Sequence, residues 1–278
     1  MARLLLVSPE PRLREALEAS PLLADHTIDV AAGDVAALRR LRRVGYDVVV
    51  TSPATPLEED VEFVEEARRA RPGIRAIALA AESTAGSVIA ALRASVFACF
   101  TAPFDASEIA DMTARALAEP PSWKDGIRVV SATEDWISLR VNCRLLTAER
   151  LVTFLDELAK ELPEPDRDGL LLAFREILMN AMEHGGRFDP SQVVEVTAVR
   201  TARTIVYYVK DPGPGFDRGD LDHAAVSNPP DDPVAHVLTR AEQGLRPGGF
   251  GLLLAGKVID ELIYNERGNE VLLIKYRS

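Results

Sequence analysis

The sequence predicts an α/β doubly wound domain followed by an α+β two-layer sandwich, and three observations carry that prediction. The chain has 278 residues, which favours two hydrophobic cores over one. Residues 1–118 alternate short apolar runs with charged amphipathic stretches, whereas the later segments group several strands around a few helices. Residues 119–126 contain two prolines and a glycine, which is typical of a linker. The predicted domains are therefore 1–118 and 127–278, joined by 119–126.

Five βα units account for the first domain. The expected strands are 4–7, 28–31, 47–51, 75–79 and 96–100. The expected helices are 11–18, 35–44, 58–70, 86–93 and 107–117. A regular alternation of this kind predicts an open parallel sheet with helices on both faces.

The second domain mixes its elements differently. The expected strands are 127–131, 138–141, 193–199, 204–210 and 270–276, and the expected helices are 148–162, 168–184 and 251–263. A polar stretch containing Pro and Gly fills 211–249. A loop of that length is uncommon in a compact domain unless it has a function, such as that of a lid.

Composition excludes several classes of protein. Lys and Arg number 32 against 43 Asp and Glu, which gives a formal net charge of −11 and argues against general binding to nucleic acid or an anionic membrane. No apolar run approaches the roughly 18 residues of a membrane helix. We expect a cytoplasmic protein. Cys99 and Cys143 lack the spacing of a zinc site and are interpreted as core thiols.

Three polar side chains recur at a spacing of four residues in one predicted helix. Glu176, Asn180 and His184 would share one side of that helix, because steps of four residues drift by only about 40°. Taken alone, this row is better explained as a solvated helix face. Asn180 is a mild objection, since asparagine lowers helix propensity.

A strand followed by glycines forms the second motif. Ile205, Tyr207, Val209 and Asp211 have the same parity, so Asp211 is expected at the end of a buried sheet face. A carboxylate there requires a donor to offset its desolvation, and the amino group of adenine is one such donor. Two further glycines, Gly213 and Gly215, would let the backbone approach a ligand closely.

A glycine cluster precedes the last predicted helix. Gly248, Gly249 and Gly251 would place free backbone N–H groups at a helix N-terminus, which suits a phosphate. Each motif is weak or moderate alone. Together, in this order, they resemble the GHKL-type ATPase fold over residues 127–278.

That resemblance implies roles for individual residues. Asn180 would bind Mg²⁺, and Asp211 would accept a hydrogen bond from the adenine of ATP. The glycines at 213, 215, 248, 249 and 251 would shape the nucleotide site and its lid, with 216–247 as the lid itself. His184 is placed with the cofactor-binding residues, and contact with phosphate, binding of a partner and capping of the helix remain open for it.

Within this fold, the string from Glu176 to Gly185 is similar to that of anti-sigma-factor serine kinases. The four histidines are His26, His184, His223 and His236, and none lies in 119–165, where a histidine kinase carries its phosphoacceptor. Glu176 would then be the general base for transfer to a serine or threonine. An anti-sigma antagonist or a sigma factor is the expected partner, and a homodimer is compatible with the resemblance. A non-catalytic ATP-responsive binding module and a slow ATPase are the alternatives.

The first domain resembles a response-regulator receiver through its strand spacing, Pro56 and the Pro103-Phe104 pair. Receivers use acidic residues, a phosphoacceptor aspartate, a hydroxyl residue and a lysine. The corresponding positions here are Ser8 and Pro9, Ser52, Ala80 or Ala81, and Ala102. Serine and alanine cannot hold Mg²⁺ and a phosphoryl group as carboxylates and lysine do. We expect a degenerate receiver-like domain that is not phosphorylated.

Overall fold

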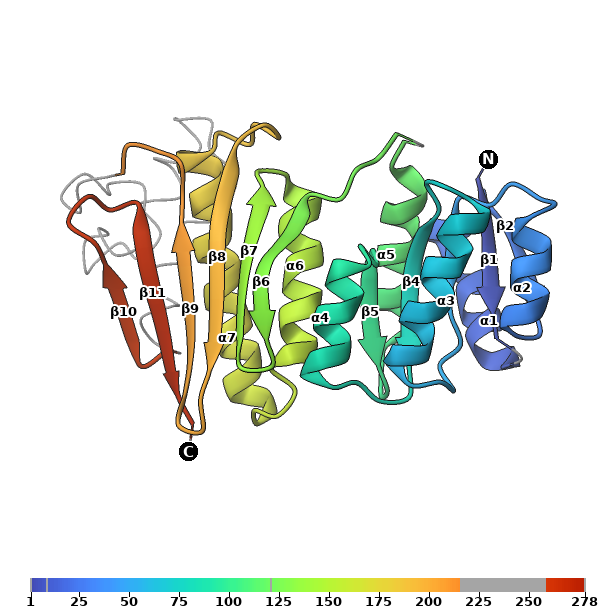
Figure 1. Cartoon of the computed structure of the whole chain (residues 1–278), viewed down its shortest axis with the longest axis horizontal. Helices are drawn as coiled ribbons and strands as arrows, with labels where there is room; N and C mark the ends of the chain where they lie inside the picture. The colour runs from blue at the N-terminus through green and yellow to red at the C-terminus, as the bar shows by residue number, and fades with distance from the viewer. Residues whose placement is uncertain (1, 9, 121, 216–258, 278) are drawn as a thin grey trace. The chain divides into compact units, whose positions relative to one another are not determined.

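The structure, a computed structural model, describes residues 2–8, 10–120, 122–215 and 259–277 (Figure 1). The chain separates into two compact units, Met1–Asp125 and Gly126–Ser278. Each unit is described by itself below.

A five-stranded parallel sheet in the order β2-β1-β3-β4-β5 forms the first unit. Its strands are β1 (Arg3–Val7), β2 (Thr27–Ala31), β3 (Val48–Val50), β4 (Arg75–Ala80) and β5 (Ala98–Thr101). Its helices are α1 (Pro11–Ala19), α2 (Asp34–Leu41), α3 (Leu57–Ala70), α4 (Ala85–Arg93) and α5 (Ala106–Ala118), with a 3₁₀ helix at Pro21–Leu23. Helix α1 contacts α5, whereas α3 contacts both α2 and α4. The helices thus form two groups that cover the two faces of the sheet. The 2-1-3-4-5 order is a doubly wound topology, as predicted.

Strand β5 begins two residues later than the sequence predicts. The N–H of Val96 bonds to the carbonyl of Ala91 at 2.9 Å, and Ser95 adopts a left-handed φ of 54°. This arrangement ends α4 in the manner of a Schellman motif. Val96 is therefore used to close the helix before the strand can start.

The segment predicted as a linker is fastened to the first unit. The buried Arg75 donates to the carbonyl oxygens of Glu119 and Pro120 at 3.0 and 3.1 Å. The rings of Trp123 and Phe97 lie 5.3 Å apart, centroid to centroid. The chain that leaves the first unit is thus held against it before the second unit begins.

Asp60 is a buried acid in the first turn of α3. Only 4% of the residue is exposed, and its Oδ1 accepts a hydrogen bond from the Thr55 hydroxyl at 3.1 Å. The other carboxyl oxygen, Oδ2, is buried and has no hydrogen-bond partner among the described residues. Desolvation raises the pKa of Asp60 to about 8, and the nearby negative charges of Asp34 and Glu59 raise it further. Hydrogen bonds from Thr51 and Thr55 lower the pKa and partly offset this rise.

Replacing Asp60 with asparagine should flatten the pH dependence of this unit's stability. The folded-state pKa lies above the unfolded value, so the native chain loses stability as pH rises from about 4 to about 8. The loss should be on the order of several kcal/mol, and Asp60→Asn should be the more stable protein at pH 8. Urea unfolding from pH 5 to 9 measures this.

The two tryptophans allow this unit to be followed separately. In a Trp136→Phe background, fluorescence comes from Trp123, which packs on Phe97 in the first unit. Glu62→Gln, which changes an exposed acid of the same helix, is the control. Parallel pH profiles for Asp60→Asn and the unsubstituted chain would show that Asp60 is not protonated in the folded protein.

The second unit is a two-layer sandwich built on an antiparallel sheet in the order β10-β11-β9-β8-β7-β6. Its strands are β6 (Ile127–Thr133), β7 (Trp136–Asn142), β8 (Val193–Arg200), β9 (Thr204–Lys210), β10 (Glu261–Tyr264) and β11 (Glu270–Tyr276). Its described helices are α6 (Leu145–Leu158) and α7 (Glu164–Asn180), followed by a π-helical turn at Ala181–Gly185. Both helices lie on one face of the sheet (Figure 1). This confirms the predicted α+β architecture.

The core of the second unit lies between that sheet face and the two helices. Ile205, Tyr207 and Val209 are buried in β9 and alternate with more exposed residues, as the sequence predicts. Phe174 of α7 meets Tyr207 edge to face, with ring centroids 4.9 Å apart. The helix that carries Glu176 is therefore fixed on the strand that leads to Asp211.

The predicted helix 251–263 is wrong in its last turn. Residues 251–258 lie outside the described part of the chain, and Glu261–Tyr264 forms strand β10. Leu262, Ile263 and Tyr264 pair antiparallel with β11. A short apolar run does not distinguish a strand from a buried helix by periodicity, and here sheet pairing decides.

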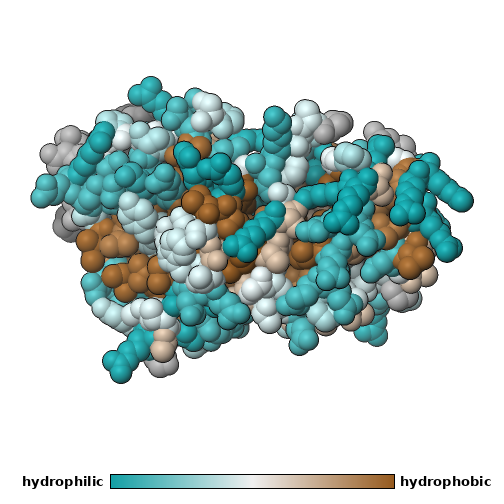
Figure 2. Space-filling model, in the orientation of Figure 1, coloured by the Kyte–Doolittle hydropathy of each residue, from teal (hydrophilic) through white to brown (hydrophobic). Residues whose placement is uncertain are grey.

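The opposite face of the second sheet is not covered by α6 or α7. Cross-strand register places Trp136, Val199, Val206 and Ile274 in one row across this face. Figure 2 shows apolar patches among polar side chains on this side of the unit. The face is thus mixed in character, in contrast to the buried one.

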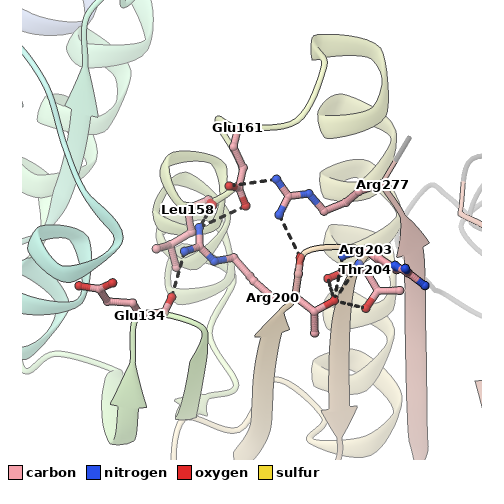
Figure 3. Close-up of polar contacts among 8 residues, drawn as sticks. Glu134, Leu158, Glu161, Arg200, Arg203, Thr204 and Arg277 are labelled. Carbon is pink, nitrogen blue, oxygen red and sulfur yellow. Dashed lines mark hydrogen bonds and ion pairs between the residues drawn. The ribbon is translucent and has the colours of Figure 1, made fainter.

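A cluster of charged groups closes the end of the sheet where β9 begins (Figure 3). Arg200 donates to the carbonyl oxygens of Leu158 and Glu134 at 2.7 and 3.0 Å. Glu161 lies between Arg200 and Arg277, at 3.6 and 3.2 Å. The cluster ties the chain after α6 to the final strand, at the end of β9 away from Asp211.

Among the described residues, none of the helices combines the length and the apolar character that a membrane crossing requires.

Candidate functional site

Helix α7 carries two of the predicted site residues, Glu176 and Asn180. Acidic side chains in its first turn interact favourably with the positive end of the helix dipole, and one side of the helix is apolar. That face includes Leu170, Phe174, Ile177 and Leu178, all buried. Glu176 and Asn180 are half-buried on the adjoining side, one turn apart.

The α-helix ends at Asn180, and a π-helical turn follows. The N–H of Gly186 bonds to the carbonyl of Ala181, five residues earlier, at 2.9 Å. His184 thus lies in this wider turn and not on the α-helix that carries Glu176 and Asn180. His184 is exposed.

Glu176 keeps a carboxylate that is only 14% exposed. Its Oε1 lies 3.6 Å from Nη1 of the neighbouring Arg175. The acid thus lies beside a cation at the edge of the core and remains partly exposed to solvent.

Asp211 follows β9 and is held through its own backbone. Its N–H donates to the carbonyl of Asn269 at 3.0 Å, and the Asn269 side-chain amide donates back to the Asp211 carbonyl at 3.4 Å. Its Oδ1 accepts the N–H of Gly213 at 2.7 Å. Burial raises the pKa of Asp211, although the Gly213 N–H and Arg267 act against that rise. The carboxylate is half-buried, as expected for the end of a buried sheet face.

Gly185, in the last position of the π-turn, packs directly on Asp211. A Cβ atom placed on Gly185 would lie 2.5 Å from Asp211 Cβ and closer still to Cγ and Oδ1. A Cβ atom on Gly213 would lie 2.7 Å from the Gly185 Cα and 2.8 Å from Asp211 Oδ1. The first and second motifs therefore meet at this carboxylate, although they are separated in the sequence.

Gly215 packs closely against the turn between β10 and β11. Its φ is +88°, and an added Cβ would overlap the carbonyl oxygen of Arg267 in the turn between β10 and β11. Arg267 Nε in turn donates to the Pro214 carbonyl at 2.9 Å. Gly215 thus permits close packing of the loop after Asp211 against the turn that contains Arg267.

The third motif cannot be placed. Gly248, Gly249 and Gly251, and the segment 216–247, lie outside the described residues.

Two buried residues that the sequence did not single out lie in the core beside this site. Cys143, expected only as a core thiol, is buried and free, and burial together with Asp189 and Asp211 raises the pKa of its thiol to about 11. Asn269 is buried beside Asp211 and also bonds to Asn265. The Gly185-Gly186 pair could have indicated close packing after the helix, but nothing in the sequence marks its partners.

The described residues contain no group of three or more His, Cys, Asp or Glu side chains arranged to hold a metal ion.

In the first unit, the positions matched to a receiver site follow the carboxyl ends of the parallel strands. Ser8 Oγ accepts the N–H of Glu10 at 3.1 Å, and Ser52 Oγ accepts that of Ala54 at 3.3 Å. Ala80 ends β4, and Ala102 precedes the cis bond to Pro103. Pro9 lies outside the described residues. The serine hydroxyls are thus used to order the local backbone.

Residues 143–275 match the family model of the histidine kinase-like ATPase domain. The chain carries this domain. It spans the described site from Cys143 to Asn269. No curated protein matches the sequence.

Solved structures that match the first unit are receiver domains. A CheY-like receiver domain protein from Methanospirillum hungatei is 16% identical over 42% of this chain and 94% of its own, with a TM-score of 0.37. CheY4 of Vibrio cholerae is 19% identical over 42% and 99%, with a TM-score of 0.37. The response regulator TrrA of Thermotoga maritima is 24% identical over 42% and 100%, with a TM-score of 0.35. The sheet order, rather than these likenesses, establishes the fold of the first unit.

Proposed function

We propose that the second unit binds ATP with Mg²⁺ and transfers phosphate to a serine or threonine of a regulatory protein, in the manner of anti-sigma-factor kinases. The observation that carries this proposal is the half-buried Asp211 carboxylate at the junction of the two motifs. It stands within a domain that matches the histidine kinase-like ATPase family.

The residues present fit the nucleotide. Asp211 offers an acceptor for an amino group, and the glycines beside it let the backbone pack directly against that carboxylate. Asn180 offers an amide oxygen, which is a hard ligand of the kind that Mg²⁺ accepts. Mg²⁺ is usually bound by one or two protein groups together with substrate phosphates, so a site without a dedicated cluster suits it.

Bound ATP would supply an electrophilic γ-phosphoryl group whose charge Mg²⁺ helps to neutralise. Glu176 would take the proton from the acceptor hydroxyl, because it is the carboxylate one helical turn before Asn180. Asp211 would orient the base. The receiver-like unit, which has serine and alanine where receivers have acids and lysine, would act by contact with partners rather than by phosphorylation.

A non-catalytic ATP-responsive module is the second candidate. The observation that favours it is the ion pair between Glu176 and Arg175, because Nη1 of Arg175 lies 3.6 Å from the carboxyl oxygen that would have to face the acceptor hydroxyl. In that case ATP would alter the affinity for a partner, and no phosphate would be transferred. A sigma factor or its antagonist is the proposed partner in both cases.

The test begins with the full-length chain and isothermal titration with ATP and Mg²⁺. We expect saturable binding of one nucleotide per chain, weakened when Mg²⁺ is removed by a chelator. Proteins captured by the chain from a lysate of its source cells are then incubated with it and γ-labelled ATP, and label on a serine or threonine supports the kinase. Absence of saturable ATP binding would contradict the whole proposal, whereas binding without labelling would favour the second candidate.

A further inference from the structure

We infer that Gly185 is a positioning residue that fixes the Asp211 carboxylate in one orientation and thereby makes the site selective for a base with an exocyclic amino group. This inference rests on the proposed nucleotide site. It adds a residue in the first motif that acts on base recognition through the second.

The contacts around Asp211 assign different tasks to its two carboxyl oxygens. Oδ1 accepts the N–H of Gly213 at 2.7 Å and lies against Gly185. Among the described residues, none donates a hydrogen bond to Oδ2. Oδ1 is therefore used inside the protein, and Oδ2 is the oxygen left for a ligand.

Gly185 holds this arrangement because it has no side chain. The Gly185 Cα lies so near Gly213 that a Cβ added to Gly213 would be 2.7 Å from it. The backbones of Gly185 and Gly213 therefore both pack against the Asp211 carboxylate. Any Cβ on Gly185 would overlap the carboxyl group and force it to rotate or shift. A rotated carboxylate would lose the Gly213 bond or turn Oδ2 away from the base.

The π-turn brings Gly185 to this place, and Cys143 supports the turn. A Cβ on Gly186 would overlap the Sγ atom of Cys143 and lie 3.0 Å from its Cβ. The thiol thus packs directly beneath the end of the turn. Two adjacent glycines have different partners, Asp211 for Gly185 and Cys143 for Gly186, which provides a matched pair of substitutions.

Gly185→Ala should weaken ATP binding by about tenfold or more, because it acts on a hydrogen bond to a charged group. Binding of inosine triphosphate, which has an oxygen in place of the amino group, should change much less. The ratio of the two affinities, measured by titration calorimetry on the full-length chain, should therefore fall toward one. A purely structural role would weaken both nucleotides together and leave the ratio unchanged.

Gly186→Ala is the control for general damage to the turn. It should lower the thermal unfolding temperature, and Cys143→Ala should restore much of that loss in the double variant, because the Sγ atom is the main obstacle. The double variant should keep the preference of the unsubstituted chain for ATP. Gly213→Ala introduces a milder clash, because its Cβ would lie 2.7 Å from the Gly185 Cα. This variant should also lower the ratio of ATP affinity to inosine triphosphate affinity. It provides the test if Gly185→Ala does not fold.

Two negative results can be told apart. If the unsubstituted chain binds neither nucleotide, the proposed function fails and the inference fails with it. If the chain binds ATP and Gly185→Ala or Gly213→Ala retains the full preference for ATP over inosine triphosphate, the proposed function stands and the role of Gly185 is wrong.

Discussion

Replacing Glu176 with glutamine should lower the rate of phosphoryl transfer by about 10²- to 10⁴-fold, the range typical of a lost general base. Glutamine has nearly the same shape and cannot take a proton. ATP binding should be spared, since Glu176 is assigned no contact with the base. The measurement is label transfer from γ-labelled ATP to the recovered partner, with nucleotide affinity determined in parallel.

Glu183→Gln makes the same chemical change in the turn after α7 and serves as the control. It is expected to keep full transfer, because Glu183 lies beyond the end of the α-helix that carries Glu176 and Asn180. Unchanged transfer in Glu176→Gln would remove Glu176 from catalysis. If regulation in cells were also unchanged, the non-catalytic module would become the better account.

Replacing Asp211 with asparagine should weaken ATP binding by roughly 10- to 100-fold, which corresponds to about 1.5–3 kcal/mol for a hydrogen bond to a charged group. Asparagine can still accept the N–H of Gly213 through its Oδ1. Its amide nitrogen would then occupy the position of Oδ2. This nitrogen is a hydrogen-bond donor and would face the amino group of the base, which is also a donor. Titration calorimetry with ATP and Mg²⁺ measures the change.

The pH dependence of binding offers a second measure of the same residue. Burial raises the pKa of Asp211, so ATP affinity should begin to fall at a higher pH than for an exposed aspartate as the solution is made acidic. Asp211→Asn should lack this decline. Asp189→Asn removes the same charge from an exposed residue whose side chain only orders Ser191, and it should bind ATP normally. Equal affinity for Asp211→Asn and the unsubstituted chain would exclude Asp211 as the base contact.

Much of the fold follows from local pattern. Strand β9 shows this well, because buried and exposed residues alternate from Thr204 to Lys210 as its sequence indicates. The parallel sheet of the first unit likewise follows from five regularly spaced βα units. Strand β10 was missed, because Leu262 and Ile263 fit a helix as well as a strand until β11 pairs with them.

The candidate site was only partly predictable, because some of its geometry depends on tertiary packing rather than on local sequence pattern. Glu176, Asn180 and Asp211 were assigned through the resemblance of the three motifs to the GHKL-type fold, because the helix row taken alone indicated a solvated face. The end of α7 could not, since a π-turn depends on how the backbone packs rather than on a period of the sequence. His184 was expected on the α-helix, whereas it lies in the π-helical turn that follows Asn180.

The sequence by itself determined the two architectures and the residue types available for chemistry, because these depend on periodicity and composition within short segments. Only the tertiary structure decided that Gly185 and Gly213 pack on Asp211, that Cys143 packs on Gly186, and that Gly215 packs against Arg267. Such contacts join segments far apart in the chain. They depend on the close approach of two backbones, and such an approach produces no periodicity or motif within either segment of the sequence.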